Sequence, residues 1–221
     1  MAGISLWLVP SETETTLLQR FMDRHPEPGA RHSFPRFHPH VTLATIQPPS
    51  EYFPPGTTRA VHVHVHDSAL LTLREAVPLG QTVVPVRFAR VVSGEHYFRS
   101  IYVALAPSPE LVGLRAALGA AGTPHPPAFP HLSLYYIADE EAHTRTRFLQ
   151  ELERENVVRP SADGQGVILD CDGSIESIVA PANAVRFLEG FMGTEIWIVD
   201  CEGPVEGWKV LDKILLAKSD H

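Results

Sequence analysis

The sequence predicts an α+β fold made of two similar halves. A short pattern occurs twice, as FHPHVTL at residues 37–43 and as FPHLSL at residues 129–134. Each copy follows a strand, a helix and a proline-rich connection, in that order. The separation between His40 and His131 is too long for one supersecondary unit, whereas it suits two similar lobes that face each other.

The first half begins with an apolar strand at residues 3–10. Ser11, followed by Glu12 and Glu14, has the composition of a helix cap with an acidic first turn, and leucine and phenylalanine at helical spacing give the helix a buried side. We expect this helix to continue to about His25. A Pro/Gly-rich stretch then breaks the helix and leads into the first histidine strand, which two consecutive prolines end.

The second half repeats this order. Residues 95–106 predict an apolar strand, and Ser108 with Pro109 marks the start of a helix. Glycines end that helix, and a loop over residues 123–130 leads into the second histidine strand. The remaining segments fill out the two lobes: strands at 61–66, 83–92, 166–170, 175–179 and 194–200, a helix at 139–155, and a tail at 208–216 that fits helix or strand and that we assign as strand.

Composition limits the class of protein. A chain of 221 residues with 44% hydrophobic content can form one compact, two-lobed domain over residues 1–221. The net charge of −8 argues against binding duplex nucleic acid, although a small anionic ligand in a local pocket stays compatible. Cys171 and Cys201 are too few for a disulfide framework, and no signal core or membrane span is recognisable, so we expect reduced thiols and a soluble intracellular protein.

Each copy of the repeated pattern places an imidazole and a hydroxyl on one surface. Side chains alternate along a strand, so His40 and Thr42 share a face, as do His131 and Ser133. Two such strands brought together would line one cleft with a proton donor, a proton acceptor and two hydroxyls. This set suits acid-base chemistry on a phosphate without a metal or another cofactor.

The paired motifs resemble those of the 2H phosphoesterase superfamily, and more narrowly its fungal 2′,3′-cyclic-nucleotide 3′-phosphodiesterase branch. The opening strand and the segment from Glu202 to Trp208 add to the resemblance, which therefore spans the chain. It implies a bilobal α+β fold with pseudo-twofold symmetry, two antiparallel sheets around a central groove, and helices outside. It also implies hydrolysis of nucleoside 2′,3′-cyclic phosphates to 2′-phosphates and of ADP-ribose 1″,2″-cyclic phosphate, a reaction of tRNA splicing.

The resemblance carries over residue by residue. His40 and His131 take the place of the motif histidines, and Thr42 and Ser133 that of the hydroxyls that contact the phosphate. A tyrosine three residues after the second hydroxyl matches Tyr136. Strict alternation instead puts Tyr135 on the face of His131. A β-bulge after Ser133 would reconcile the two, and we favour Tyr136.

Hydrolysis of a cyclic phosphodiester needs a base and an acid on opposite sides of the phosphorus. We assign His131 as the base and His40 as the acid, although the sequence allows the reverse. Tyr97, Phe98 and Arg99 are candidates for holding the base or sugar of a substrate. Arg36 could supply positive charge near the first motif, and residues 47–55 could cover the groove.

Other interpretations compete with this one. His62, His64 and His66 project from one face of a predicted strand and suggest a metal site, to which His38 and His40 are also available. No cysteine or carboxylate completes a compact ligand set. A noncatalytic nucleotide-binding module, or an enzyme that processes RNA ends, would use the same groove. We expect a monomer that acts on a small nucleotide, in the cytoplasm, and the resemblance to fungal relatives allows a Golgi-associated pool.

Overall fold

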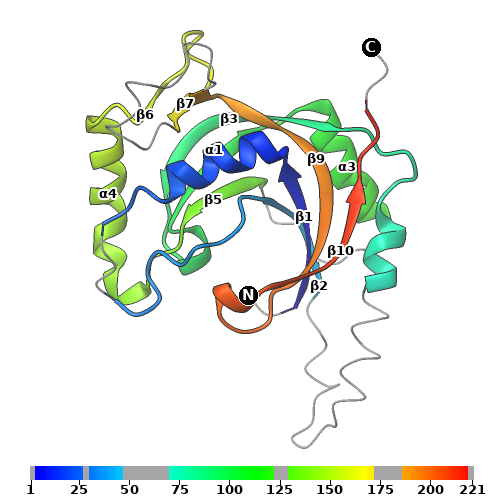
Figure 1. The fold of residues 1–221 in the computed structure, drawn as a ribbon. Coiled ribbons are helices and arrows are strands. Elements are labelled where there is room, and N and C mark those ends of the chain that lie inside the picture. The colour runs from blue at the N-terminus through cyan, green and yellow to red at the C-terminus, as the bar shows by residue number, and fades with distance from the viewer. Residues whose placement is uncertain (1–2, 27–29, 47–69, 122–128, 172–185, 219–221) are drawn as a thin grey trace, which may run out of the picture.

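The structure, a computed structural model, describes residues 3–26, 30–46, 70–121, 129–171 and 186–218. Antiparallel strands and a few helices form the predicted α+β architecture (Figure 1). The strands are β1 (Ile4–Pro10), β2 (Val41–Ile46), β3 (Val84–Ser93), β4 (Ile101–Ala106), β5 (His131–Tyr135), β6 (Val158–Pro160), β7 (Val167–Asp170), β8 (Phe187–Leu188), β9 (Gly190–Asp200) and β10 (Lys209–Leu215). The helices are α1 (Glu12–Met22), α3 (Pro109–Ala120) and α4 (Ala142–Arg154), with 3₁₀ turns η2 (Tyr97–Arg99), η3 (Asp139–Glu141) and η5 (Val205–Gly207).

The strands form a closed circuit. The main sheet has seven strands in the order β1-β2-β5-β4-β3-β9-β10, and β1 also pairs with β9. The long strand β9 therefore joins β1 along one edge and β3 with β10 along the other. Strands β6, β7 and β8 form a second sheet of three strands. The strand pair β2–β5 is the seam at which the two halves of the chain meet.

The two halves repeat one structural unit, as the sequence predicts. In each half, an antiparallel strand pair is connected through a helix, as β1-α1-β2 and as β4-α3-β5. The hydroxyls of Ser11 and Ser108 accept hydrogen bonds from the backbone N–H groups at the start of α1 and α3. Both pairs carry a β-bulge at the same place, at Leu43 in β2 and at Leu134 in β5.

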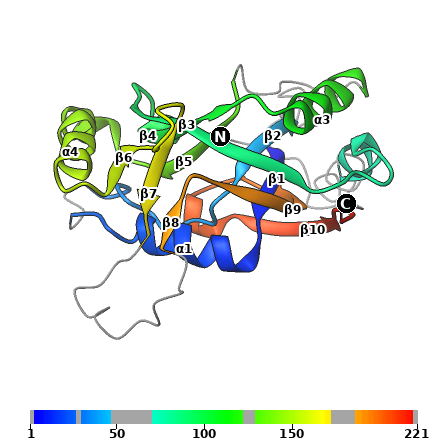
Figure 2. The same cartoon turned by 90° about the horizontal axis from the view of Figure 1, so that it is seen from above.

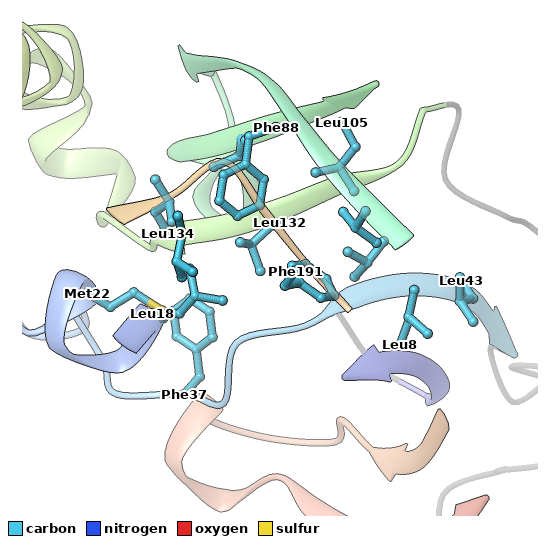
Figure 3. Packing of buried hydrophobic residues seen from close by; sticks show 14 of the residues in the cluster. Leu8, Leu18, Met22, Phe37, Leu43, Phe88, Leu105, Leu132, Leu134 and Phe191 are labelled. Atoms are coloured by element: carbon cyan, nitrogen blue, oxygen red, sulfur yellow. The ribbon is translucent and has the colours of Figure 1, made fainter. Parts of the chain in front are cut away.

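The apolar side chains of these strands form one core. Leu8, Leu43, Leu132 and Phe191 come from four strands and lie against one another (Figure 3). Helix α1 adds its buried face to this core through residues such as Leu18. Helices α3 and α4 lie at opposite ends of the molecule in both views (Figures 1 and 2). The face of β1, β2 and β5 that points away from this core carries polar and aromatic side chains.

Some element boundaries differ from the sequence prediction. Helix α1 ends at Met22 rather than near His25, because the N–H of Arg24 donates to the carbonyl of Phe21 in a tightened last turn. Residues 95–100 are not strand: they contain the 3₁₀ turn η2, and the segment is closed by a hydrogen bond from Gly94 N–H to the Ser100 carbonyl. The tail is a strand, β10, as assigned.

Several predicted segments lie outside the described residues: the strands at 61–66 and 175–179, most of the loop at 123–130, and the proposed cover at 47–55. Cys171 and Cys201 are free and buried. Within the described part of the chain, no helix has both the length and the apolar character needed to cross a membrane.

Candidate active site

The seam between β2 and β5 brings the two motifs together. Val41 pairs with Leu132 in antiparallel register, and both side chains point into the core. Their sequence neighbours therefore occupy the opposite face, with His40 across from Ser133 and Thr42 across from His131. Residues on such a diagonal, as His40 and His131 are, lie about 7–8 Å apart, enough for a phosphate group between their rings.

The bulge in β5 decides which tyrosine joins this face. Ser133 is opposite Tyr102 and Tyr135 is opposite Ile101, so Leu134 is the extra residue. Because the bulge resets the alternation, Tyr136 and not Tyr135 shares the face of Ser133. Ser133 and Tyr136 are hydrogen-bonded through their side chains.

Tyr135 instead belongs to the core beneath α1. Its hydroxyl donates to the carbonyls of Phe21 and Arg24, at 2.8 and 2.9 Å. Both tyrosines are buried, and burial raises the pKa of each phenol. The expected position of Tyr136 and the bulge that it required are therefore both present.

Both motif histidines are oriented in the same way. Nδ1 of His40 lies 2.7 Å from the carbonyl oxygen of His38, and Nδ1 of His131 lies 3.2 Å from that of Phe129. A carbonyl only accepts, so Nδ1 carries the hydrogen in each neutral ring and Nε2 stays available as the acceptor. The carbonyl is two residues upstream in each case, across a proline whose fixed φ helps to hold this geometry.

Aromatic rings that the sequence reasoning did not assign to the site also hold these histidines. Trp7 stacks on His40 with ring centroids 3.6 Å apart and planes 9° apart. Tyr102 contacts His131 edge-on at 5.3 Å. Trp7 and Tyr102 are equivalent in the two repeats, since each lies opposite the motif hydroxyl on the neighbouring strand. Only the strand register reveals this relation, because the two residue types differ.

The electrostatic environment keeps both imidazoles neutral in the free protein. Burial lowers the pKa of His40 from 6.5 to about 3, and the hydrogen bond to the His38 carbonyl only partly opposes this. Burial also lowers the pKa of the less enclosed His131, and positive charge on Arg99 and Arg115 lowers it further. Of the two, His40 is thus the more firmly deprotonated.

The contribution of Arg99 can be measured. Its guanidinium lies over the ring of Phe129, 5.7 Å from the centroid, and that ring is 5.4 Å from the ring of His131. Replacing Arg99 with glutamine should raise the pKa of His131, because a nearby cation disfavours the imidazolium. NMR titration of the imidazole signals measures this change. Arg147→Gln on the exposed side of α4 is the control, and an unchanged His131 pKa in Arg99→Gln would contradict the coupling.

The two hydroxyls differ in their partners. Ser133 donates to the carbonyl of Phe98 at 3.0 Å, which links β5 to the 3₁₀ turn η2. Thr42 lies beside Trp7 and is 9% exposed. Arg36, which directly precedes the first motif, is exposed and paired with Asp23 at 3.3 Å.

The described residues contain no cluster of three or more His, Cys, Asp or Glu side chains that could hold a metal ion. His38, the one motif neighbour that could have contributed, stacks on Trp197 with ring centroids 4.3 Å apart. The histidines at 62, 64 and 66 lie outside the part of the chain that the structure describes. The metal-site alternative therefore has no support from the residues around His40.

Comparison with known proteins identifies the family of the chain. The model of the cyclic phosphodiesterase-like protein family matches residues 1–216, nearly the whole chain. The chain belongs to this family. It is thus a 2H phosphoesterase, as the paired motifs indicated. No curated protein matches the chain.

Solved structures are similar to this cyclic phosphodiesterase-like protein at low sequence identity. Escherichia coli LigT in complex with 3′-AMP is 14% identical, covers 98% of each chain, and has a TM-score of 0.50. A structure described as a phosphoesterase is 14% identical, covers 98% of this chain and 99% of its own, and has a TM-score of 0.47. The LigT likeness shows the fold alone, and assignment to the fungal branch stays a prediction.

Proposed function

We propose that this cyclic phosphodiesterase-like protein hydrolyses nucleoside 2′,3′-cyclic phosphates to nucleoside 2′-phosphates, and ADP-ribose 1″,2″-cyclic phosphate to ADP-ribose 1″-phosphate. One observation carries the proposal: His40 and His131 project from one face of the β2–β5 seam, each with its Nδ1 on a carbonyl and its Nε2 available. Escherichia coli LigT has the same fold with 3′-AMP bound, so this fold accommodates a nucleoside phosphate.

In the proposed reaction, water attacks phosphorus in line with the ribose 3′ oxygen. One imidazole takes a proton from the water as the new P–O bond forms, and the other gives a proton to the 3′ oxygen as its bond to phosphorus breaks. Thr42 donates a hydrogen bond to one nonbridging oxygen. Ser133 donates to the other when its hydroxyl hydrogen turns from the Phe98 carbonyl to the phosphate, and Tyr136 lies beside it. No metal or other cofactor takes part.

The pKa order favours His40 as the base and His131 as the acid. The group with the lower pKa is the one that is neutral when the other is protonated, and the pKa of His40 is lowered to about 3. Binding of an anionic phosphate raises the pKa of the more accessible His131, so that this imidazole is protonated in the complex. This order is the reverse of the assignment favoured by sequence, which left both orders open.

The pH dependence of kcat/KM reports the two free-protein pKa values. We expect activity to persist well below pH 6, because His40 stays neutral until the pH approaches 3. Above the lowered pKa of His131 the acid loses its proton, so kcat/KM should fall about tenfold per pH unit. Measurement from pH 4 to pH 8.5 tests this, and a value that keeps rising to pH 8 would rule it out.

The substrate assignment is tested by direct assay. The purified protein is incubated in EDTA with each of the four nucleoside 2′,3′-cyclic phosphates and with ADP-ribose 1″,2″-cyclic phosphate, and the phosphate isomer formed is identified by ³¹P NMR. Formation of 2′-phosphates in EDTA supports the proposal. Tight nucleotide binding without turnover would indicate a binding module, and turnover only of RNA ends would indicate an RNA-processing enzyme.

A further inference from the structure

Trp208 contacts both halves of the proposed catalytic centre. It follows the 3₁₀ turn η5 and lies at the start of β10, far in sequence from either motif. Its ring centroid is 5.6 Å from that of Trp7, which stacks on His40, and 6.3 Å from that of Tyr136, which bonds Ser133. This tryptophan therefore borders the place where a substrate would meet the histidines.

The indole N–H of Trp208 is an unpaired donor. Nε1 is buried, yet among the described residues it has no hydrogen-bond partner. Buried donors in folded proteins almost always have an acceptor, and leaving one unpaired is costly. A bound substrate that supplies an acceptor would explain why the Trp208 N–H has no protein partner at the edge of the catalytic centre.

The rings around Trp208 indicate which part of a substrate lies there. The ring centroid of Phe98, from the 3₁₀ turn η2, is 6.0 Å from that of Trp208 with planes 27° apart, and Tyr97 packs edge-on against Phe98 at 4.9 Å. These three rings are half-buried. Aromatic faces of this kind suit stacking with a planar base, and a base offers carbonyl oxygens and ring nitrogens as acceptors. In the proposed reaction the phosphate is held by the two imidazoles and two hydroxyls of the motifs, so these rings are left for the base.

We propose that Trp208 and Phe98 form the nucleobase subsite, in which the base stacks against these rings and accepts a hydrogen bond from the Trp208 indole N–H. This inference rests on the proposed function and adds to it the residues that bind the base of the substrate. Because Phe98 and Trp208 lie far apart in the sequence, the bound base contacts two separate segments of the chain.

The chain offers a matched control in Trp197. Its Nε1 donates to the carboxylate of Glu195 at 2.5 Å, and its ring is covered by Lys213 on one side and stacked on His38. Trp208→Phe and Trp197→Phe remove the same N–H group, one without a protein partner and one with a charged partner. We expect Trp197→Phe to lower the melting temperature and leave KM unchanged. We expect Trp208→Phe to raise KM and leave the melting temperature unchanged.

The decisive experiment compares two substrates, a nucleoside 2′,3′-cyclic phosphate and methyl riboside 2′,3′-cyclic phosphate, which lacks the base. Trp208→Phe should raise KM about tenfold for the first, the effect of one lost hydrogen bond, and leave KM for the second unchanged. An equal rise for both substrates would assign the donor to the sugar or phosphate and overturn the subsite. An unchanged KM for both would overturn it as well.

A binding measurement separates this inference from the proposed reaction. Calorimetry with a nucleoside 2′-monophosphate, set against ribose phosphate, gives the affinity for the base without turnover. If the wild-type protein hydrolyses none of the cyclic phosphates but binds the nucleotide more weakly after Trp208→Phe, the reaction is wrong and the subsite stands. If it hydrolyses them and the variant binds the nucleotide normally, the reaction stands and the subsite is wrong.

Discussion

Replacing His40 or His131 with alanine should lower kcat by about 10² to 10⁴-fold, the usual contribution of a positioned acid or base. The loss should be similar in the double variant, because the two imidazoles act on one phosphorus as a unit. Steady-state rates on a 2′,3′-cyclic nucleotide measure it, and circular dichroism checks the fold. The mechanism would be falsified if both single variants turned over substrate at nearly the wild-type rate.

The same two variants also separate the acid from the base. A nitrophenyl phosphodiester releases a leaving group that needs no protonation, so loss of the acid costs little on that substrate. We therefore expect His131→Ala to recover most of its activity on the aryl ester and His40→Ala to remain impaired. The reverse result would exchange the two assignments, and equal recovery in both would leave neither histidine as the base.

Replacing Arg145 with alanine should lower the free energy of unfolding by about 3 kcal/mol, the largest structural effect that we expect. The side chain is 1% exposed, and its guanidinium donates to the carbonyls of Glu95 and Ile137, at 2.8 and 2.7 Å. It also pairs with the carboxylate of Asp139 at 2.5 Å. Removing it leaves two carbonyls without this charged donor and opens a cavity beside them.

Urea unfolding gives the loss of stability, and Arg154→Ala on the same helix is the control. Arg154 is 71% exposed and pairs with Glu151 at 3.4 Å, so its removal should cost less than about 0.5 kcal/mol. Arg145 also ties the segment before η2 to the segment after β5, close in sequence to Phe98 and Tyr136. Equal stability of the two variants would show that the buried guanidinium contributes nothing beyond a surface ion pair.

Local patterning predicted much of the candidate site. The alternation of side chains along a strand placed His40 with Thr42 and His131 with Ser133, and both pairs do share a face. The helix starts at Ser11 and Ser108 followed from capping chemistry, and both caps are present. These features depend on residues a few positions apart, so they can be predicted from the sequence.

Long-range pairing decided the rest. The bulge at Leu134 that turns Tyr136 towards Ser133 exists because β5 pairs with β4 in one register, and a tyrosine at either position fits the local pattern. The overlong strand prediction at residues 95–106 has a different cause: the backbone groups of Gly94 and Ser100 bond to each other within a turn, which the apolar pattern does not indicate.

The sequence by itself determined the groups on which the proposed reaction depends: two histidines, two hydroxyls and a duplicated strand to present each pair. Only the tertiary structure decided which aromatic rings surround them. Trp7 reaches His40 from a neighbouring strand, and Trp208 arrives from the far end of the chain. Contacts between strands are fixed by hydrogen bonds across the sheet and by burial of a shared core. The interaction partners are therefore set by the whole fold, whereas the identity of the reacting groups is set by a few adjacent residues.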